Sequence, residues 1–353
     1  MRMAVLTSGG DAPGMNAAIR GIAGAGIARG HRVIGVRRGY EGLLDGDTVE
    51  LDLGAVDGVT RLGGTILGSA RSAVFPTPAG QARAKERLRA LGVDALFVIG
   101  GNGSLTGAHL LGGGERPCTI VGLPASIDND IGHSGLAIGV DTAVNTIMEA
   151  CDRISDTARA HRRAFIVEVM GRRCGFLAMR AGIAAEAEAI LYGERPVAED
   201  ELVARLRQVL RRCFGPGGHK KRALIVKSEG VTVPTARLVA RLQEHLGEDA
   251  PGVEIRETIL GHVVRGGSPS AIDRMIAQRL AFAAVLACES GQHDVMMGWD
   301  VPGGFGAPTG DPSVRAVALA DVLAETERLL DGTSPVVRKR IELLAQVEDL
   351  LAL

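Results

Sequence analysis

The sequence predicts an α/β protein made of two doubly wound, Rossmann-like domains with parallel-rich sheets. Short apolar runs alternate with longer amphipathic segments along most of the chain, and glycine-rich strings follow the apolar runs. The length of 353 residues also exceeds one average domain of about 100–200 residues. Continuous apolar strands separated by helices are typical of parallel sheets covered on both faces.

The expected elements follow from the local periodicity. Strands are expected where apolar residues run together, at residues 3–7, 32–36, 94–99, 119–123, 164–170, 223–227 and 254–260. Helices are expected where apolar residues recur at helical spacing, at 15–29, 140–159 and 199–212, and in the tail after residue 318. The first of these helices is expected to stop at Gly30, because glycine is a common residue just past a helix end.

Charge and composition exclude several classes of protein. Lys plus Arg (40) nearly cancel Asp plus Glu (41), so no global electrostatic footprint for nucleic acid or an anionic membrane exists. No apolar run approaches the roughly 18 residues that span a bilayer, and no signal-peptide core is present. The five scattered cysteines indicate reduced, mostly buried thiols. We expect a soluble cytoplasmic protein without nucleic-acid or membrane partners.

Polar and glycine-rich strings follow the expected strands, at residues 8–11, 100–104, 124–130, 171–173, 228–230 and 265–268. In open α/β sheets ligands bind beyond the carboxyl ends of the strands, so several of these loops are expected to meet at one crevice. The P-loop pattern is absent, and the string from Gly101 to Gly107 misses the dinucleotide fingerprint by one residue. A nucleotide bound here would be held in another way.

Two carboxylates, Asp128 and Asp130, come directly after an expected strand. Acidic residues at such a place commonly cap the next helix. The alternative is a catalytic site, in which one carboxylate accepts a hydroxyl proton and the other manages the charge of a metal ion. The small residues before the pair and Asn129 within it favour the catalytic alternative.

Several cationic residues lie close to strand ends. They are Arg163, Arg172, Arg256, His262 and Arg265. Surface ion pairs are the ordinary interpretation of such arginines, and a lone histidine is usually structural. His262 and Arg265, three residues apart before a Gly-Gly-Ser-Pro string, look more like one anion pocket that suits a sugar phosphate.

Six strings together resemble the phosphofructokinase family, kinases that phosphorylate the 1-hydroxyl of fructose 6-phosphate. The strings are residues 6–20, 63–71, 99–107, 126–130, 167–172 and 260–269, in family order. The resemblance implies an active site in the cleft between two domains. Residues 1–139 plus about 263–312 would form the larger, nucleotide-binding domain, and residues 140–262 plus about 313–353 the smaller, sugar-phosphate-binding domain.

The resemblance also implies roles for individual residues. Asp128 corresponds to the general base, and Gly10, Arg71 and Arg172 to the groups that stabilise the phosphoryl group in flight. The nucleotide site corresponds to Gly10, Tyr40, Arg71, Ser72, Gly101, Asn102, Gly103 and Ser104. The sugar site corresponds to Ser126, Ile127, Asp128, Met170, Gly171, Arg172 and Glu229.

The 6-phosphate pocket corresponds to Arg163, Arg256, His262 and Arg265. In the family Arg163 and Arg256 reach across from a neighbouring subunit, which implies a homo-oligomer, dimer or tetramer, with shared sites.

The phosphoryl donor follows from two positions of the family pattern. Pyrophosphate-using members carry an acidic residue where Gly103 lies and a lysine where Ala125 lies, so ATP is the expected donor. Asn102 replaces the aspartate that helps to hold Mg²⁺, which predicts weaker metal binding because hard cations favour charged oxygens. Asp130 is a further metal ligand, acting through water. Gly24 and Ser155 replace arginines of the family's effector site, which puts the usual effector control in doubt.

The leading hypothesis is an ATP-dependent, Mg²⁺-requiring enzyme of glycolysis that converts fructose 6-phosphate to fructose 1,6-bisphosphate and ADP. One alternative is a specialised paralogue that uses another phosphorylated sugar or pyrophosphate. Another is a weakly catalytic, sugar-phosphate-binding regulatory protein.

Overall fold

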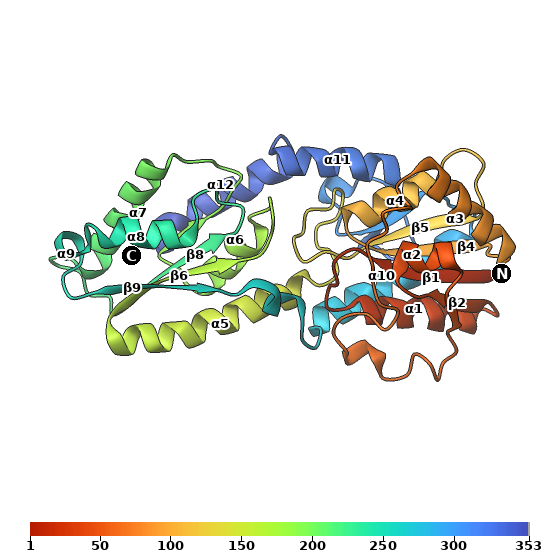
Figure 1. Ribbon diagram of the computed structural model, residues 1–353, viewed down its shortest axis with the longest axis horizontal. Coiled ribbons are helices and arrows are strands. Elements are labelled where there is room, and N and C mark those ends of the chain that lie inside the picture. Colours follow the sequence, from red (N-terminus) through yellow and green to blue (C-terminus); the bar gives the residue numbers. More distant parts are fainter. Residues whose placement is uncertain (352–353) are drawn as a thin grey trace. The chain divides into compact units, whose positions relative to one another are not determined.

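The computed structural model describes residues 1–351, which divide into two compact units (Figure 1). The first unit comprises residues 1–142 and 265–329, and the second comprises residues 143–264 and, of the described residues, 330–351. The chain therefore leaves the first unit within one helix, α5 (Val140–His161), and returns within η2 (Gly261–Arg265).

The first unit is built on an eight-stranded sheet with the order β11-β12-β10-β5-β4-β1-β2-β3. Its strands are β1 (Arg2–Ser8), β2 (Arg32–Val36), β3 (Thr48–Glu50), β4 (Ala95–Gly100), β5 (Thr119–Pro124), β10 (Val295–Trp299), β11 (Ala307–Pro308) and β12 (Val314–Ala318). The central pairs are parallel, and antiparallel pairs occur only toward the two edges.

The helices of the first unit pack against this sheet. They are α1 (Met15–Ala28), α2 (Gly39–Asp45), α3 (Pro78–Ala90), α4 (Asn102–Gly112), α10 (Ala271–Glu289) and α11 (Leu319–Asp331), with the short helices η1 (Val59–Arg61) and η3 (Pro302–Gly304). Helices α1 and α10 pack on each other, and Figure 1 shows them on the opposite side of the sheet from α3 and α4. The parallel strands are buried from both faces for this reason.

The second unit is built on a four-stranded sheet with the order β7-β8-β6-β9, in which all pairs are parallel. Its strands are β6 (Arg163–Val169), β7 (Ala189–Leu191), β8 (Ala223–Ser228) and β9 (Glu254–Ile259). Its further helices are α6 (Phe176–Ala184), α7 (Glu199–Phe214), α8 (Thr235–Gln243), α9 (Leu246–Asp249) and α12 (Pro335–Leu351). Leucines of α7 and α8 pack on Ile166 and Ile225 of the sheet to form the core.

The expected α/β class with parallel-rich sheets is confirmed, and the expected strands and helices are present with their ends shifted by a few residues. The sequence analysis missed β3, β7, β10, β11 and β12. Three of these strands are only two or three residues long, and such runs carry too few alternations to reveal a period.

The division of the chain differs from the expected one for residues 313–329. The structure places them in the first unit, because β12 pairs with β10 along its whole length. All five cysteines are buried free thiols, as expected, and burial raises the pKa of Cys118 to about 12. Among residues 1–351, no helix is both long and apolar enough to cross a membrane.

Candidate active site

Three loops of the first unit begin at the same level of the sheet. The last residues of β1, β4 and β5 lie in register, with Ser8 opposite Gly100 and Gly100 opposite Pro124. The backbone N–H of Ala125 then donates to the carbonyl oxygen of Gly100 at 3.0 Å, which keeps two of the loops together past the strand ends. The loops that carry Gly10, Asn102 and Asp128 are therefore neighbours.

The loop after β1 lies against a cation. A Cβ on Gly10 would lie 2.8 Å from Nη1 of Arg265, and this guanidinium donates to the carbonyl oxygen of Asp11 at 3.2 Å. The small size of Gly10 accommodates this approach without a shift of the arginine, so exposed Gly10 and half-buried Arg265 form one electropositive corner. Arg265 was assigned to the 6-phosphate pocket by resemblance, and the structure places it beside the loop assigned to the transferred phosphoryl group.

The segment that carries Arg71 and Ser72 is tied to the same corner. The Ser69 hydroxyl donates to the carbonyl oxygen of Gly9 at 2.6 Å. Arg71 follows two residues later and is exposed, whereas the Ser72 hydroxyl accepts the N–H of Phe75 at 3.1 Å. Arg71 is thus the member of this segment with a side chain available to a ligand.

Helix α4 begins at the carboxyl end of β4. Gly101 is its N-cap, and a Cβ on Gly103 would meet nothing within 4 Å, which leaves open space for a phosphate at the helix N-terminus. Ser104, by contrast, is buried, and a Cβ on Gly9 would lie 3.1 Å from its hydroxyl oxygen. The structure therefore gives the Ser104 side chain a packing position.

Tyr40, assigned to the nucleotide site by resemblance, is also buried. Its hydroxyl donates to the carbonyl oxygen of Ser104 at 2.6 Å, and its ring stacks on Phe75 at 3.9 Å between centroids. Burial raises the pKa of the Tyr40 hydroxyl above its ordinary value. The structure thus shows Tyr40 anchoring the first turn of α4.

The loop after β5 carries the two expected carboxylates in a buried setting. Asp128 is 3% exposed and Asp130 is 8% exposed. The Ser126 hydroxyl accepts the backbone N–H of Asp128 at 3.3 Å and donates to Oδ1 of Asp130 at 3.0 Å. The next helix, α5, begins only at Val140, so neither carboxylate caps it and the capping alternative is wrong.

Asn129 holds this loop in shape. Its side-chain amide donates to the carbonyl oxygen of Gly135 at 3.1 Å, and its Oδ1 accepts the N–H of Ala137 at 3.0 Å. The φ angle of Asn129 is 51°, a left-handed conformation that asparagine tolerates better than most residues. Ile127 beside it is fully buried. The Asn129 amide thus holds the far part of the loop, and the Ser126 hydroxyl, bonded to Asp130, holds its start.

In the second unit, the turn after β6 carries Met170, Gly171 and Arg172. Oε1 of Glu229 accepts the N–H of Gly171 at 3.1 Å and the N–H of Arg172 at 2.7 Å. Gly171 and Arg172 both have positive φ, 141° and 51°, and Met170 is buried while the Arg172 side chain is exposed. Glu229 and the turn, both assigned to the sugar site, are therefore in direct contact.

Arg163 and Arg256 lie side by side across β6 and β9 and share one carboxylate. Glu254 Oε2 accepts from Nε of Arg163 at 3.0 Å and from Nη2 of Arg256 at 2.8 Å. The hydrogen bond from Arg256 is the largest cause, and with the charge of Arg163 it lowers the pKa of Glu254. His262 is exposed and belongs to the second unit, whereas Arg265 belongs to the first, so the structure assigns this expected pair to different units.

A magnesium site formed by protein side chains alone is absent from residues 1–351, because no three His, Cys, Asp or Glu residues cluster there in a metal-binding geometry. Asn102, Asp128 and Asp130 nevertheless lie on the neighbouring loops after β4 and β5. Mg²⁺ is commonly held by one or two carboxylates, water and substrate phosphates. The oxygens of these three side chains are of the type that such an ion binds.

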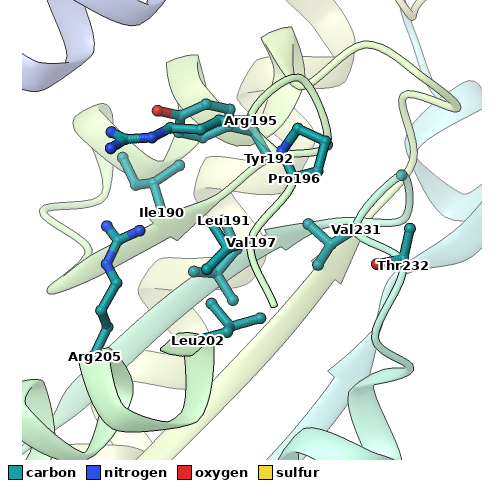
Figure 2. A pocket seen from close by; sticks show the side chains of 12 residues that line it. Ile190, Leu191, Tyr192, Arg195, Pro196, Val197, Leu202, Arg205, Val231 and Thr232 are labelled. Carbon is teal, nitrogen blue, oxygen red and sulfur yellow. The ribbon is translucent and has the colours of Figure 1, made fainter. Parts of the chain in front are cut away.

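Two cavities lie among the described residues, and the smaller one is lined in part by Gly230, next to Glu229. The one in Figure 2, between residues 190–197 and 230–232 of the second unit, has a volume of about 40 Å³, close to the roughly 30 Å³ share of one water molecule. A larger cavity of about 530 Å³ separates α10 from residues 308–312. At its edge Arg279 pairs with Asp311 and lies 4.5 Å from the ring centre of Trp299. None of the residues assigned to catalysis lines either cavity.

These observations define an α/β enzyme that can hold an anionic ligand at the carboxyl ends of parallel strands. The sequence profile of phosphofructokinase matches residues 2–288. The ATP-dependent 6-phosphofructokinase of Thermotoga neapolitana is 51% identical over 296 residues, covering 84% of this chain and 89% of the relative. That of Brevibacillus brevis is 46% identical over 301 residues, with coverages of 84% and 89%. The chain belongs to the phosphofructokinase family, as its motifs predicted.

Solved structures support the same fold. Phosphofructokinase from Saccharomyces cerevisiae has a TM-score of 0.85 at 32% identity, covering 98% of this chain and 50% of that chain. This chain thus spans about half the length of the yeast chain. The pyrophosphate-dependent phosphofructokinase from Marinobacter aquaeolei has a TM-score of 0.75 at 22% identity, covering 98% of this chain and 91% of that chain, and shares the fold.

Sequence reasoning missed Glu194, which accepts a hydrogen bond from the N–H of Gly175 at the end of the turn after β6. The signal was weak, because Glu194 follows β7, a strand of three residues that the apolar pattern did not reveal.

Proposed function

We propose that the chain transfers the terminal phosphoryl group of ATP to the 1-hydroxyl of fructose 6-phosphate, giving fructose 1,6-bisphosphate and ADP in glycolysis. The observation that carries this proposal is the row of loops after β1, β4 and β5, where open glycine backbone neighbours the buried carboxylate of Asp128. The names of the relatives, ATP-dependent 6-phosphofructokinases, support the same donor and acceptor.

In the proposed reaction the carboxylate of Asp128 takes the proton from the 1-hydroxyl while that oxygen attacks the terminal phosphorus. Arg71 and Arg172 stabilise the charge on the transferred group, and the bare backbone at Gly10 lets its oxygens approach. Asp128 and Arg71 belong to the first unit and Arg172 to the second. Positioning and charge stabilisation supply most of the catalysis, because phosphoryl transfer needs no covalent help from the protein.

The donor side uses the N-terminus of α4. The backbone N–H groups of Asn102 and Gly103 would donate hydrogen bonds to phosphate oxygens there. The open space at Gly103 leaves room for the third phosphate of ATP. A bound Mg²⁺ would neutralise phosphate charge beside Asn102, Asp128 and Asp130. The roles of a nucleotide-binding first unit and a sugar-phosphate-binding second unit belong to this proposal.

The acceptor side uses Ser126, Ile127, Met170, Gly171, Arg172 and Glu229 for the sugar and Arg163, Arg256, His262 and Arg265 for its 6-phosphate. The pairing of Arg163 and Arg256 on Glu254 supports a shared function for these two arginines. A phosphate dianion would attract both guanidiniums more strongly than one exposed carboxylate does. If they serve a neighbouring subunit, the protein acts as a homodimer or homotetramer.

The test is a product assay with purified protein, Mg²⁺ and fructose 6-phosphate, supplied with either ATP or pyrophosphate and followed by phosphorus NMR. We expect fructose 1,6-bisphosphate with ATP alone. Product with pyrophosphate would contradict the inference from Gly103. No product with either donor would favour another phosphorylated sugar or a regulatory protein that binds without catalysis.

Asn102 favours a second candidate, a specialised paralogue with an altered donor or sugar, because it removes a charge from the proposed metal site. The variant Asn102→Asp restores that charge and is expected to lower the Mg²⁺ concentration for half-maximal rate several-fold. A magnesium titration measures this, with Asn145→Asp as a control amide on α5. Superimposable titrations for parent and Asn102→Asp would remove residue 102 from the metal site.

A further inference from the structure

Three loops at the carboxyl end of the second sheet pack backbone against backbone. A Cβ on Gly193, after β7, would lie 2.7 Å from the carbonyl oxygen of Gly230, after β8. A Cβ on Gly230 would in turn collide with the carbonyl oxygen of Arg172, after β6. Strands β7, β8 and β6 are adjacent, so the loop after β7 packs on the loop after β8, which in turn packs on the turn assigned to the sugar.

Glu194 lies in the loop after β7 and reaches the same turn directly. Its Oε1 accepts the N–H of Gly175 at 2.6 Å. A Cβ on Gly175 would lie 2.6 Å from Oε2 of Glu194 and 2.5 Å from Cβ of Tyr192. The loop and the turn therefore fit only because residue 175 is glycine, and the carboxylate fixes where that glycine lies.

The turn from Met170 to Gly175 is thus held at both ends by carboxylates from two neighbouring loops. Glu229 accepts the N–H groups of Gly171 and Arg172 at its start, and Glu194 accepts the N–H of Gly175 at its end. The N–H of Cys174 also donates to the carbonyl oxygen of Gly171 at 2.8 Å, which closes the turn between the two anchors.

We propose that Glu194 is a positioning residue for sugar-phosphate binding: it fixes the far end of the turn whose near end presents Gly171 and Arg172. This inference rests on the proposed function for the identity of the ligand, and on the contacts above for the positioning. Glu194 acts through the backbone of Gly175, at the opposite end of the turn from the assigned sugar-site residues, so its role is distinct from that of Glu229.

The surroundings of Glu194 suit a fixed acceptor. Burial raises its pKa, and the bond from Gly175 and the charge of Arg340 act in the opposite direction. Arg340, on α12, also donates to Sγ of Cys174 at 3.6 Å and lies 4.6 Å from the ring centre of Phe176, the first residue of α6. The turn is therefore enclosed on the side away from Glu229 by Glu194 and Arg340.

The test compares Glu194→Ala with Glu194→Gln. Alanine removes the acceptor for the Gly175 N–H, whereas glutamine keeps an oxygen at the same reach. We expect Glu194→Ala to raise the KM for fructose 6-phosphate about tenfold or more, the effect of losing one hydrogen bond to a charged group. The KM for ATP should stay within about twofold. Glu194→Gln should restore most of the affinity, and Glu201→Ala, an exposed residue of α7, should match the parent.

A second measurement keeps the inference separate from the proposed function. Amide hydrogen exchange of residues 170–176 reports the order of the turn whether or not the protein phosphorylates fructose 6-phosphate. Faster exchange in Glu194→Ala, reversed in Glu194→Gln, is the expected result. Unchanged exchange in Glu194→Ala, or an equal rise of both KM values in the alanine and glutamine variants, would overturn the proposal. An inactive parent protein would contradict the proposed function alone.

Discussion

The two units hold their site loops by different chemistry. In the first unit neutral groups do most of this work: the Ser69 hydroxyl fixes the loop after β1, and the Asn129 amide fixes the loop after β5, where one carboxylate, Asp130, accepts the Ser126 hydroxyl. In the second unit carboxylates do it, since Glu229 and Glu194 hold the turn of residues 170–175. The same kind of strand-end loop is thus stabilised in two ways within one chain.

This difference separates carboxylates that take part in the proposed reaction from carboxylates that stabilise a turn. In the proposed reaction Asp128 of the loop after β5 takes a proton, whereas Asp130 of the same loop also accepts the Ser126 hydroxyl. Where carboxylates shape the loop, the backbone N–H groups are held more tightly, because bonds to an ionised acceptor are about twice as strong as neutral ones. We therefore expect the turn of the second unit to depend more strongly on its two carboxylate acceptors than the first-unit loops depend on their neutral ones.

The largest expected effect comes from removing the carboxylate of Asp128, the proposed general base. Asp128→Ser should lower kcat by about 10²–10⁴, the usual contribution of a general base. Binding of fructose 6-phosphate should persist, because the loop is held by Asn129. Steady-state kinetics and calorimetric binding measure the two quantities, with Asp57→Ser, an exposed site of the first unit, as the control. Unchanged kcat would remove Asp128 from its assigned role.

The next effect breaks a buried ion pair of the second unit. Lys227 is 1% exposed, and its Nζ donates to Oε2 of Glu168 at 2.9 Å. Burial opposes ionisation of Glu168, yet the bonds from Thr235 and Lys227 lower its pKa overall. Lys227→Met leaves this carboxylate without its cationic partner and should reduce the free energy of unfolding by about 3–5 kcal/mol.

Urea denaturation measures that loss, and the double variant Lys227→Met with Glu168→Leu is its matched control. Because the double variant buries no unpaired charge, it should recover most of the stability. A single variant no less stable than the double one would contradict the role given to the pair.

A smaller effect is expected for the neutral scaffold of the first unit. Asn129→Ala removes the bonds to Gly135 and Ala137 and should cost about 1–3 kcal/mol of unfolding free energy. Asn129→Asp keeps the acceptor for the Ala137 N–H but buries a charge and places a carboxylate oxygen against the Gly135 carbonyl oxygen, so it should cost at least as much. Thermal and urea unfolding compare the three proteins. A loss for Asn129→Ala larger than that for Lys227→Met would reverse the contrast between the units.

Local patterns predicted the parts of the fold that depend on neighbours in sequence. The strands before Ser8, Gly100 and Pro124 and the loops that follow them were foreseen, because long apolar runs and glycine strings are local signals. The family itself was recognised from strings that lie in those loops.

Contacts between distant segments could not be predicted in the same way. From the sequence alone Asp128 and Asp130 could have capped the next helix, because no local signal showed that this helix begins only at Val140. Tyr40 and Ser104 were assigned to a ligand, yet the structure packs them against each other and places both side chains inside the fold. The hydrogen bond from Gly175 to Glu194 depends on the pairing of β7 with β8. The sequence does not reveal this pairing, because β7 is only three residues long.

The position of Trp299 has a practical consequence. It is the single tryptophan of the chain, and it lies in the first unit beside Arg279. Tryptophan fluorescence therefore follows the unfolding of the first unit, whereas far-ultraviolet circular dichroism sums the helices of both. Coincident transitions by the two probes would mean that the units unfold as one cooperative body, and separate transitions would give each unit its own midpoint.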